Sequence, residues 1–150
     1  MESELHNANI SELMNDVLKS VGLLNKEIEL RFGMSSARIL TLLAFTERET
    51  MRMSELSEAM SLTTSASTRM VDNLVREGLV VRGDDKCDRR LVTVGLTGNG
   101  KKIAKDIKAF RGRYIDSIKD KVKERGEDEM ISSLKILIDA FGNFKSLLRC

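Results

Sequence analysis

One stretch of the sequence decides the fold: Met53–Thr97, which reads MSELSEAMSLTTSASTRMVDNLVREGLVVRGDDKCDRRLVTVGLT. Apolar residues spaced three and four apart predict two helices in its first half, a short one over about 54–60 and a longer one over about 63–77. Gly78 marks the end of the second helix, because glycine adopts the left-handed backbone that a helix C-terminus often requires. The stretch therefore begins with two helices joined by a turn.

The second half of this stretch predicts a β-hairpin. β-branched residues are concentrated at 79–82 and 91–96, and the charged segment 83–90 lies between them. A helix-turn-helix followed by a hairpin is a winged helix. The usual role of this arrangement is to place its second helix in a DNA major groove with the hairpin beside it.

Amphipathic helices are expected on both sides of this stretch. Apolar residues recur every three or four positions in four further segments, 8–32, 36–48, 98–125 and 127–148. The winged part fills only the middle third of the chain and is too small to cover all of these apolar stripes. Because uncovered stripes of this size normally mark an interface, we expect a two-fold symmetric homodimer.

The fold class follows from these elements. We expect a mainly α-helical protein with a winged helix-turn-helix lobe, a small β-hairpin wing and long terminal helices. The chain is expected to be a single unit over residues 1–150, in which 36–97 forms the DNA-binding lobe and 8–32 and 98–148 form the dimerisation region.

The composition excludes several classes of protein. Its 41% hydrophobic and 32% charged residues are typical of a globular protein, and the net charge of +2 does not by itself indicate a nucleic-acid partner. No apolar run approaches the roughly 18 residues of a membrane span, and the acidic segment Met1–Glu4 is unlike a secretory signal, so a cytoplasmic location is expected. Two cysteines (Cys87 and Cys150) and one histidine (His6) give no basis for a metal or cofactor site. No nucleophile–base pair, phosphate-binding loop or paired carboxylates indicate an enzyme.

The outward face of the second helix carries the side chains expected to read DNA. Ser65, Thr68 and Arg69 lie in its first turns, where small hydroxyls permit close approach and an arginine can pair with guanine O6 and N7. Ser67 and Arg76 complete the set of DNA contacts predicted on this helix. The alternative is an ordinary solvated helix face.

Two motifs resemble a known family. The run Thr68–Arg82 is similar to the recognition helix and first wing strand of the MarR family of transcriptional regulators, and Asp88–Gly100 resembles its wing signature, an Asp-x-Arg tip followed by a strand that ends in Leu-Thr. The order and separation of the two motifs also match. The resemblance implies a triangular homodimer, and the two-fold symmetry of a dimer in turn predicts a pseudo-palindromic DNA operator. It also implies regulation of nearby genes, often as a repressor released by a small phenolic or lipophilic ligand or by oxidation.

The resemblance also assigns roles to the tip of the wing. In the family pattern the last arginine of Asp-x-Arg enters the minor groove and the aspartate braces it, which implies Arg90 and Asp88 here. Arg89 and Lys86 complete the DNA contacts predicted at the tip. The alternative is that these are solvated hairpin charges among acidic neighbours. Gly95 departs from the family pattern, which has a side chain there, and predicts a more flexible wing.

The sequence constrains the input signal less than the DNA contacts. Flexible methionines, two aromatic rings and one cation would suit a small aromatic or lipophilic effector, at Phe32, Arg38, Phe45, Met53 and Met60. The alternative is that these residues are plain core. A second hypothesis for the input is oxidation of Cys87 at the wing tip. The alternative function from another class is a winged-helix protein-interaction module.

Overall fold

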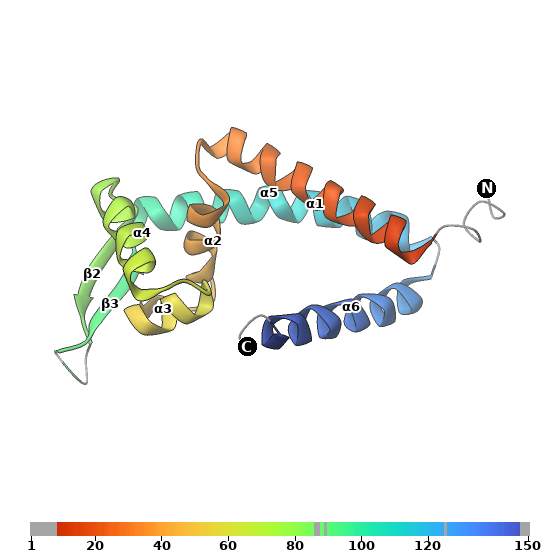
Figure 1. Ribbon diagram of the computed structural model, residues 1–150. Helices are drawn as coiled ribbons and strands as arrows, with labels where there is room; N and C mark the ends of the chain where they lie inside the picture. Colours follow the sequence, from red (N-terminus) through yellow and green to blue (C-terminus); the bar gives the residue numbers. More distant parts are fainter. Residues whose placement is uncertain (1–8, 86–87, 89, 125, 148–150) are drawn as a thin grey trace. The chain divides into compact units, whose positions relative to one another are not determined.

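The computed structural model describes residues 9–85, 88, 90–124 and 126–147 (Figure 1). In that part of the chain the elements are α1 (Ile10–Phe32), α2 (Ser36–Ala44), β1 (Thr50–Arg52), α3 (Met53–Ala59), α4 (Thr64–Arg76), β2 (Val80–Asp84), β3 (Val92–Leu96), α5 (Gly98–Lys123) and α6 (Glu127–Leu147). The chain divides into two compact units, Met1–Phe110 and Arg111–Cys150. The mainly helical fold with a small antiparallel sheet confirms the predicted fold class.

One apolar core holds the first unit together. Its fully buried apolar side chains come from five helices and two strands: Ile28, Leu42, Leu56, Val71, Leu74, Val80, Val94 and Ile107. Burial of each such side chain stabilises the fold by roughly 2 kcal/mol. Because Val71 and Leu74 are three positions apart on α4, they fix which face of that helix points inward, and the opposite face is left to solvent.

The sheet has three strands in the order β1-β3-β2, one more than the predicted hairpin. The central strand, β3, pairs antiparallel with both neighbours, so that Gly95 lies opposite Thr50 on β1 and Val81 on β2. The sequence does not predict β1, because three residues with a single buried side chain, Met51, give too short a pattern.

The glycine in the central strand has a packing reason. A Cβ at Gly95 would lie 3.0 Å from the carbonyl oxygen of Glu49 and 3.1 Å from Thr50 Cγ2. The close approach of β1 therefore favours glycine here. Gly95 is buried and paired on both sides, so the close packing of β1 accounts for this glycine, and the more flexible wing stays a prediction from the sequence.

One threonine links the wing to the helices on either side of it. Thr97 Oγ1 donates to the carbonyl oxygen of Gly78 at 2.7 Å and accepts from the amide of Gly100 at 3.0 Å. The first bond holds the chain just after α4, where Gly78 has the left-handed φ of 68° that the sequence predicts. The second bond satisfies an amide that the N-terminus of α5 would leave unpaired.

A glutamate caps the junction between α1 and α2. Glu29 Oε1 accepts from the amide of Ser36 at 2.6 Å and from its hydroxyl at 2.7 Å. Gly33 ends α1 with a φ of 62°, which turns the chain so that Ser36 comes within reach of the carboxylate. The side-chain and backbone hydrogen bonds from Ser36 lower the pKa of Glu29 below its ordinary value of 4.5.

This capping bond predicts a pH dependence of stability. A carboxylate with a lowered pKa in the folded state contributes stability in full above its unfolded pKa, and the contribution is lost as the pH falls through the folded pKa. We expect Glu29→Gln to lower the free energy of unfolding at pH 7, and the difference from the wild type to shrink below about pH 4. Urea unfolding at several pH values measures this difference. A difference that is constant from neutral to acidic pH would show that the charge of Glu29 has no part in the cap.

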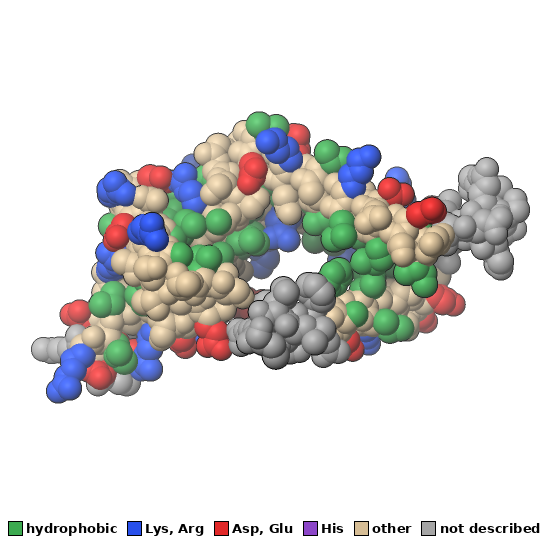
Figure 2. Space-filling view, viewed as in Figure 1, with side chains coloured by type: hydrophobic (Ala, Val, Ile, Leu, Met, Phe, Trp, Pro, Cys, Tyr) green, Lys and Arg blue, Asp and Glu red, His purple; other side chains and the backbone are tan. Residues whose placement is uncertain are grey.

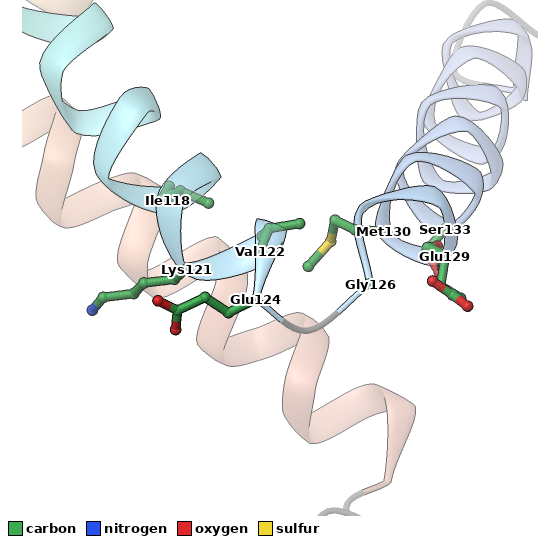
Figure 3. Close-up of a pocket in the computed structure, with 8 residues that line it drawn as sticks. All are labelled: Ile118, Lys121, Val122, Glu124, Gly126, Glu129, Met130 and Ser133. Carbon is green, nitrogen blue, oxygen red and sulfur yellow. Dashed lines mark hydrogen bonds between the residues drawn. The ribbon is translucent and has the colours of Figure 1, made fainter.

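The second unit joins the last turns of α5 to α6 through a turn at Gly126, whose φ is 119°. An open groove of about 830 Å³ lies between the two helices (Figure 3). Val122 and Met130 point toward one another across it, and Ile118 adds to its apolar lining. Nothing among the described residues of this unit fills the groove.

Candidate nucleic-acid interface

The exposed face of α4 presents four of the five side chains of this helix that are predicted to contact DNA. Thr63 caps the helix, since its Oγ1 accepts from the amide of Ala66 at 3.3 Å. Ser65 and Arg69 are exposed, and Thr68 is half-buried. Figure 1 shows this helix beside the hairpin of β2 and β3 in the same lobe.

The hydroxyl groups on this face are already oriented by the helix. Thr68 Oγ1 donates to the carbonyl oxygen of Thr64 at 2.8 Å, and the Ser65 and Thr63 hydroxyl oxygens lie 3.2 Å apart. Because the Thr68 hydrogen is used within the helix, this side chain offers a lone pair and a methyl group to a ligand. Both are groups that contact base edges in the major groove.

Ser67 does not lie on this face. It is 2% exposed, and its hydroxyl donates to the carbonyl oxygen of Thr63 at 3.0 Å. Ser67 precedes Val71 by four positions and Leu74 by seven, so the helical repeat places all three side chains on the core side. The structure therefore corrects the prediction that Ser67 contacts DNA.

The remaining charges of α4 are tied to neighbouring groups. Arg76 folds back along its own helix, where Nη2 contacts Asn73 Oδ1 and Nε donates to the carbonyl oxygen of Asp72 at 3.4 Å. The Asp72 carboxylate pairs with Arg82 Nη1 on β2 at 2.7 Å. This ion pair joins the recognition face to the wing. Within the described part of the chain, no acidic side chain pairs with Arg69.

The wing tip holds one of the predicted arginines in the described part of the chain. Arg90 is exposed, and its backbone amide donates to Asp88 Oδ1 at 3.0 Å. The aspartate thus orders the backbone at Arg90. The other three predicted residues at the tip, Lys86, Cys87 and Arg89, lie outside the described residues.

Charges of both signs mix over the winged lobe. Figure 2 shows Lys and Arg side chains next to Asp and Glu side chains on the face in view. The wing itself carries Arg82 and Arg90 together with Asp84, Asp85 and Asp88. Any affinity for DNA therefore depends on the placement of single arginines more than on a broad basic field.

The five residues predicted to hold an effector have different contacts in the structure. Phe32 packs edge-to-face on Phe110, with ring centroids 6.3 Å apart, and Arg38 forms an ion pair with Glu77 at the end of α4. Met53 and Met60 are half-buried against the core. Phe45 borders a cavity of about 360 Å³, which none of the other four lines; its other lining residues are Thr46, Glu49, Leu96, Lys101, Ala104, Lys105 and Lys108.

The described residues form neither a metal site nor a membrane span. Among the described residues, no group of three or more His, Cys, Asp and Glu side chains is placed to hold a metal ion. The helices in that part of the chain are also too short or too polar to cross a membrane.

The lobe has a helix-turn-helix whose second helix carries an exposed arginine, and a hairpin that ends in a further exposed arginine. This arrangement defines a winged-helix DNA-binding protein. Known proteins agree with this class. A sequence model of the MarR family matches residues 26–91. The chain is 32% identical over 121 residues to the uncharacterized HTH-type transcriptional regulator YfiV of Bacillus subtilis (strain 168), which covers 81% of this chain and 66% of YfiV.

Two further comparisons cover most of both chains. The HTH-type transcriptional repressor MdtR of the same organism is 26% identical over 136 residues, with 83% of each chain covered. The crystal structure of wild type MarR in its apo form from E. coli shares the fold with a TM-score of 0.65 and 25% identity, over 89% of this chain and 97% of that chain. The chain belongs to the MarR family of winged-helix transcriptional regulators. These relatives are transcription factors, which agrees with the prediction that the chain is not an enzyme.

Proposed function

We propose that this protein is a homodimeric, sequence-specific repressor that binds a pseudo-palindromic DNA operator in the cytoplasm and is released by a small effector. The observation that carries DNA reading is the exposed face of α4 beside the wing. Arg69 lies exposed on that helix and Arg90 lies exposed on the hairpin of the same lobe. Repression is supported by the likeness to MdtR, which is a repressor.

The homodimer is supported by apolar side chains left open on the long helices. On α6, Leu134 is 49% exposed and Phe141 is 53% exposed, and on α1 Val17 is 50% exposed. Figure 2 shows such side chains open on the described part of α6. Exposed apolar surface of this extent is unusual in a monomer. A second copy of the chain is the partner that closed two-fold symmetry would provide.

The effector has narrower support. The cavity beside Phe45 combines an apolar floor of Phe45, Leu96 and Ala104 with three lysines of α5. A small acidic aromatic molecule matches this combination of apolar and cationic groups. Cys87 lies outside the described residues, so oxidation at the wing remains a prediction from the sequence.

Selection of duplexes from a random pool tests DNA reading directly. We expect the selected sites to have dyad symmetry with half-sites one helical turn apart, roughly 34 Å. We also expect the affinity for the best duplex to fall steeply with salt, because phosphate contacts release counterions. Sites without dyad symmetry, or binding that is insensitive to salt, would contradict the proposed function.

Two arginine variants separate the roles of helix and wing. We expect Arg69→Ala and Arg90→Ala each to weaken binding to the selected duplex by about 1–3 kcal/mol, while the fold stays intact. Arg69→Ala should relax preference at one symmetric pair of major-groove positions. Arg90→Ala should relax preference for A·T pairs at the flanks, where a narrow minor groove attracts arginine.

Lys119→Ala is a matched control for the loss of one positive charge. Lys119 lies on α5 outside the winged lobe and pairs with Asp116 at 3.8 Å. Its removal should leave the selected sequence unchanged. Identical changes in specificity from both arginine variants would contradict the division between helix and wing.

A further inference from the structure

An ion pair crosses the sheet from its first strand to the wing tip. Arg52 is the last residue of β1, and its Nε donates to Asp85 Oδ2 at 2.8 Å. Asp85 directly follows β2, on the far side of the central strand. Its side chain is only 12% exposed, so this charge-assisted bond is better shielded from solvent than an ordinary surface pair.

The same carboxylate also binds the main chain at Asp88. Asp85 Oδ1 accepts from the amide of Asp88 at 3.1 Å. Asp88 Oδ1 in turn accepts from the amide of Arg90 at 3.0 Å. Arg52 is therefore linked to the exposed arginine of the wing through two successive aspartates, although it lies far from the tip in sequence.

The other end of this chain of bonds lies at the start of a helix. The backbone amide of Arg52 donates to Glu55 Oε2 at 2.8 Å, in the first turn of α3. One residue thus contacts the helix-turn-helix through its main chain and the wing through its side chain. Arg52 is thus one of the links between wing and helices, beside the Asp72–Arg82 ion pair and the hydrogen bonds of Thr97.

We propose that Arg52 is a positioning residue for DNA recognition: it holds Asp85, and through Asp85 and Asp88 it presets the backbone from which Arg90 reaches DNA. This role rests on the DNA-binding function proposed above. It adds to that function that operator affinity also depends on Arg52, a residue outside the recognition helix and the wing. A bound conformation that is already ordered in the free protein reduces the entropy lost on binding.

The charge of Asp85 makes the test sharp. If Asp85 were only an acid near DNA, Asp85→Asn would strengthen binding by removing repulsion of the phosphates. Because asparagine keeps an acceptor for the Asp88 amide but loses the ion pair with Arg52, we expect weaker binding, by about fivefold to tenfold. Asp84→Asn is the matched control: it removes an exposed neighbouring acid of β2, and its affinity should equal or exceed that of the wild type.

A double-mutant cycle tests whether Arg52 acts through Arg90. On the selected duplex, we expect Arg52→Ala to lose about fivefold to tenfold in affinity in the wild-type background and less than about twofold in the Arg90→Ala background. Arg48→Ala is a second control, since Arg48 pairs with Glu55 at 3.5 Å and has no ion pair with the wing in the described part of the chain. Thermal unfolding of each full-length variant confirms that it is folded. If Arg52→Ala does not fold, Asp85→Asn in the two backgrounds completes the same cycle.

The outcomes separate this role from the proposed function. Wild-type or tighter binding by Asp85→Asn overturns the positioning role alone, provided that Arg90→Ala weakens binding. An equal loss from Arg52→Ala with and without Arg90 also overturns it, and would indicate a direct phosphate contact by Arg52. Unchanged binding by Arg90→Ala itself would overturn the minor-groove role of the wing, and the positioning role with it.

Discussion

Gly100→Ala is expected to destabilise the folded protein by about 3 kcal/mol, the upper part of the usual range for forcing an extra methyl group into a packed site. A Cβ at Gly100 would lie 2.0 Å from the carbonyl oxygen of Leu79 and 3.0 Å from its carbonyl carbon. Both of these are backbone atoms, so no rotation of a side chain relieves the clash. Either α5 or the start of β2 must move, and both contribute to the core.

A second glycine in the same helical turn provides the control. A Cβ at Gly98 would meet nothing within 4 Å. Gly98→Ala should therefore leave stability unchanged or raise it slightly, because alanine loses less backbone entropy than glycine on folding. Urea unfolding of both variants gives the comparison. A free energy of unfolding for Gly100→Ala within about 1 kcal/mol of the wild type would contradict the close contact between α5 and Leu79.

Leu134→Glu is expected to convert the proposed dimer to a monomer. Leu134 lies on the apolar stripe of α6, and a carboxylate there would be desolvated without a partner when a second copy covers the helix. Wild-type protein should scatter light as a species of twice the 16.8 kDa of one chain, and the variant as a single chain. Operator affinity should also fall when dimerisation is lost, because the two half-sites are then no longer bound by one linked pair of lobes.

Ser132→Glu is the matched control for added charge on α6. Ser132 is exposed and lies two positions before Leu134, which places it on nearly the opposite side of the helix. This variant should remain dimeric and keep its affinity for DNA. A wild-type protein that stays monomeric across micromolar concentrations would refute the dimer outright.

Most of the helices were predictable from the sequence because their signals are local. The apolar repeat and a following glycine place the ends of α1 and α4, where Gly33 and Gly78 take the left-handed backbone. The end of α2 was set too late, at residue 48, whereas the helix ends at Ala44. After Phe45 the chain is polar, and the Phe45 amide already bonds the carbonyl oxygen of Leu42 in a tighter turn.

In the site, too, features set by local spacing were predictable, and features set by contacts distant in sequence were not. The burial of Ser67 could have been predicted, since its spacing from Val71 and Leu74 sets its direction from the helix. The strand β1 and the Arg52–Asp85 ion pair could not, because both depend on contacts between segments far apart in sequence. Local patterns identify the surface proposed to face DNA, but not the bonds that hold it in place.

Thr97 makes its two hydrogen bonds to segments on either side of the wing. Its hydroxyl bonds both the carbonyl group of Gly78, which follows the recognition helix, and the amide of Gly100 in the first turn of α5, so these two pieces of backbone are tied at one residue. We therefore expect a tilt of α5 to be passed on to the recognition helix. In a dimer, such a tilt would change the distance between the two recognition helices on the DNA. The side chains that each helix presents would stay the same.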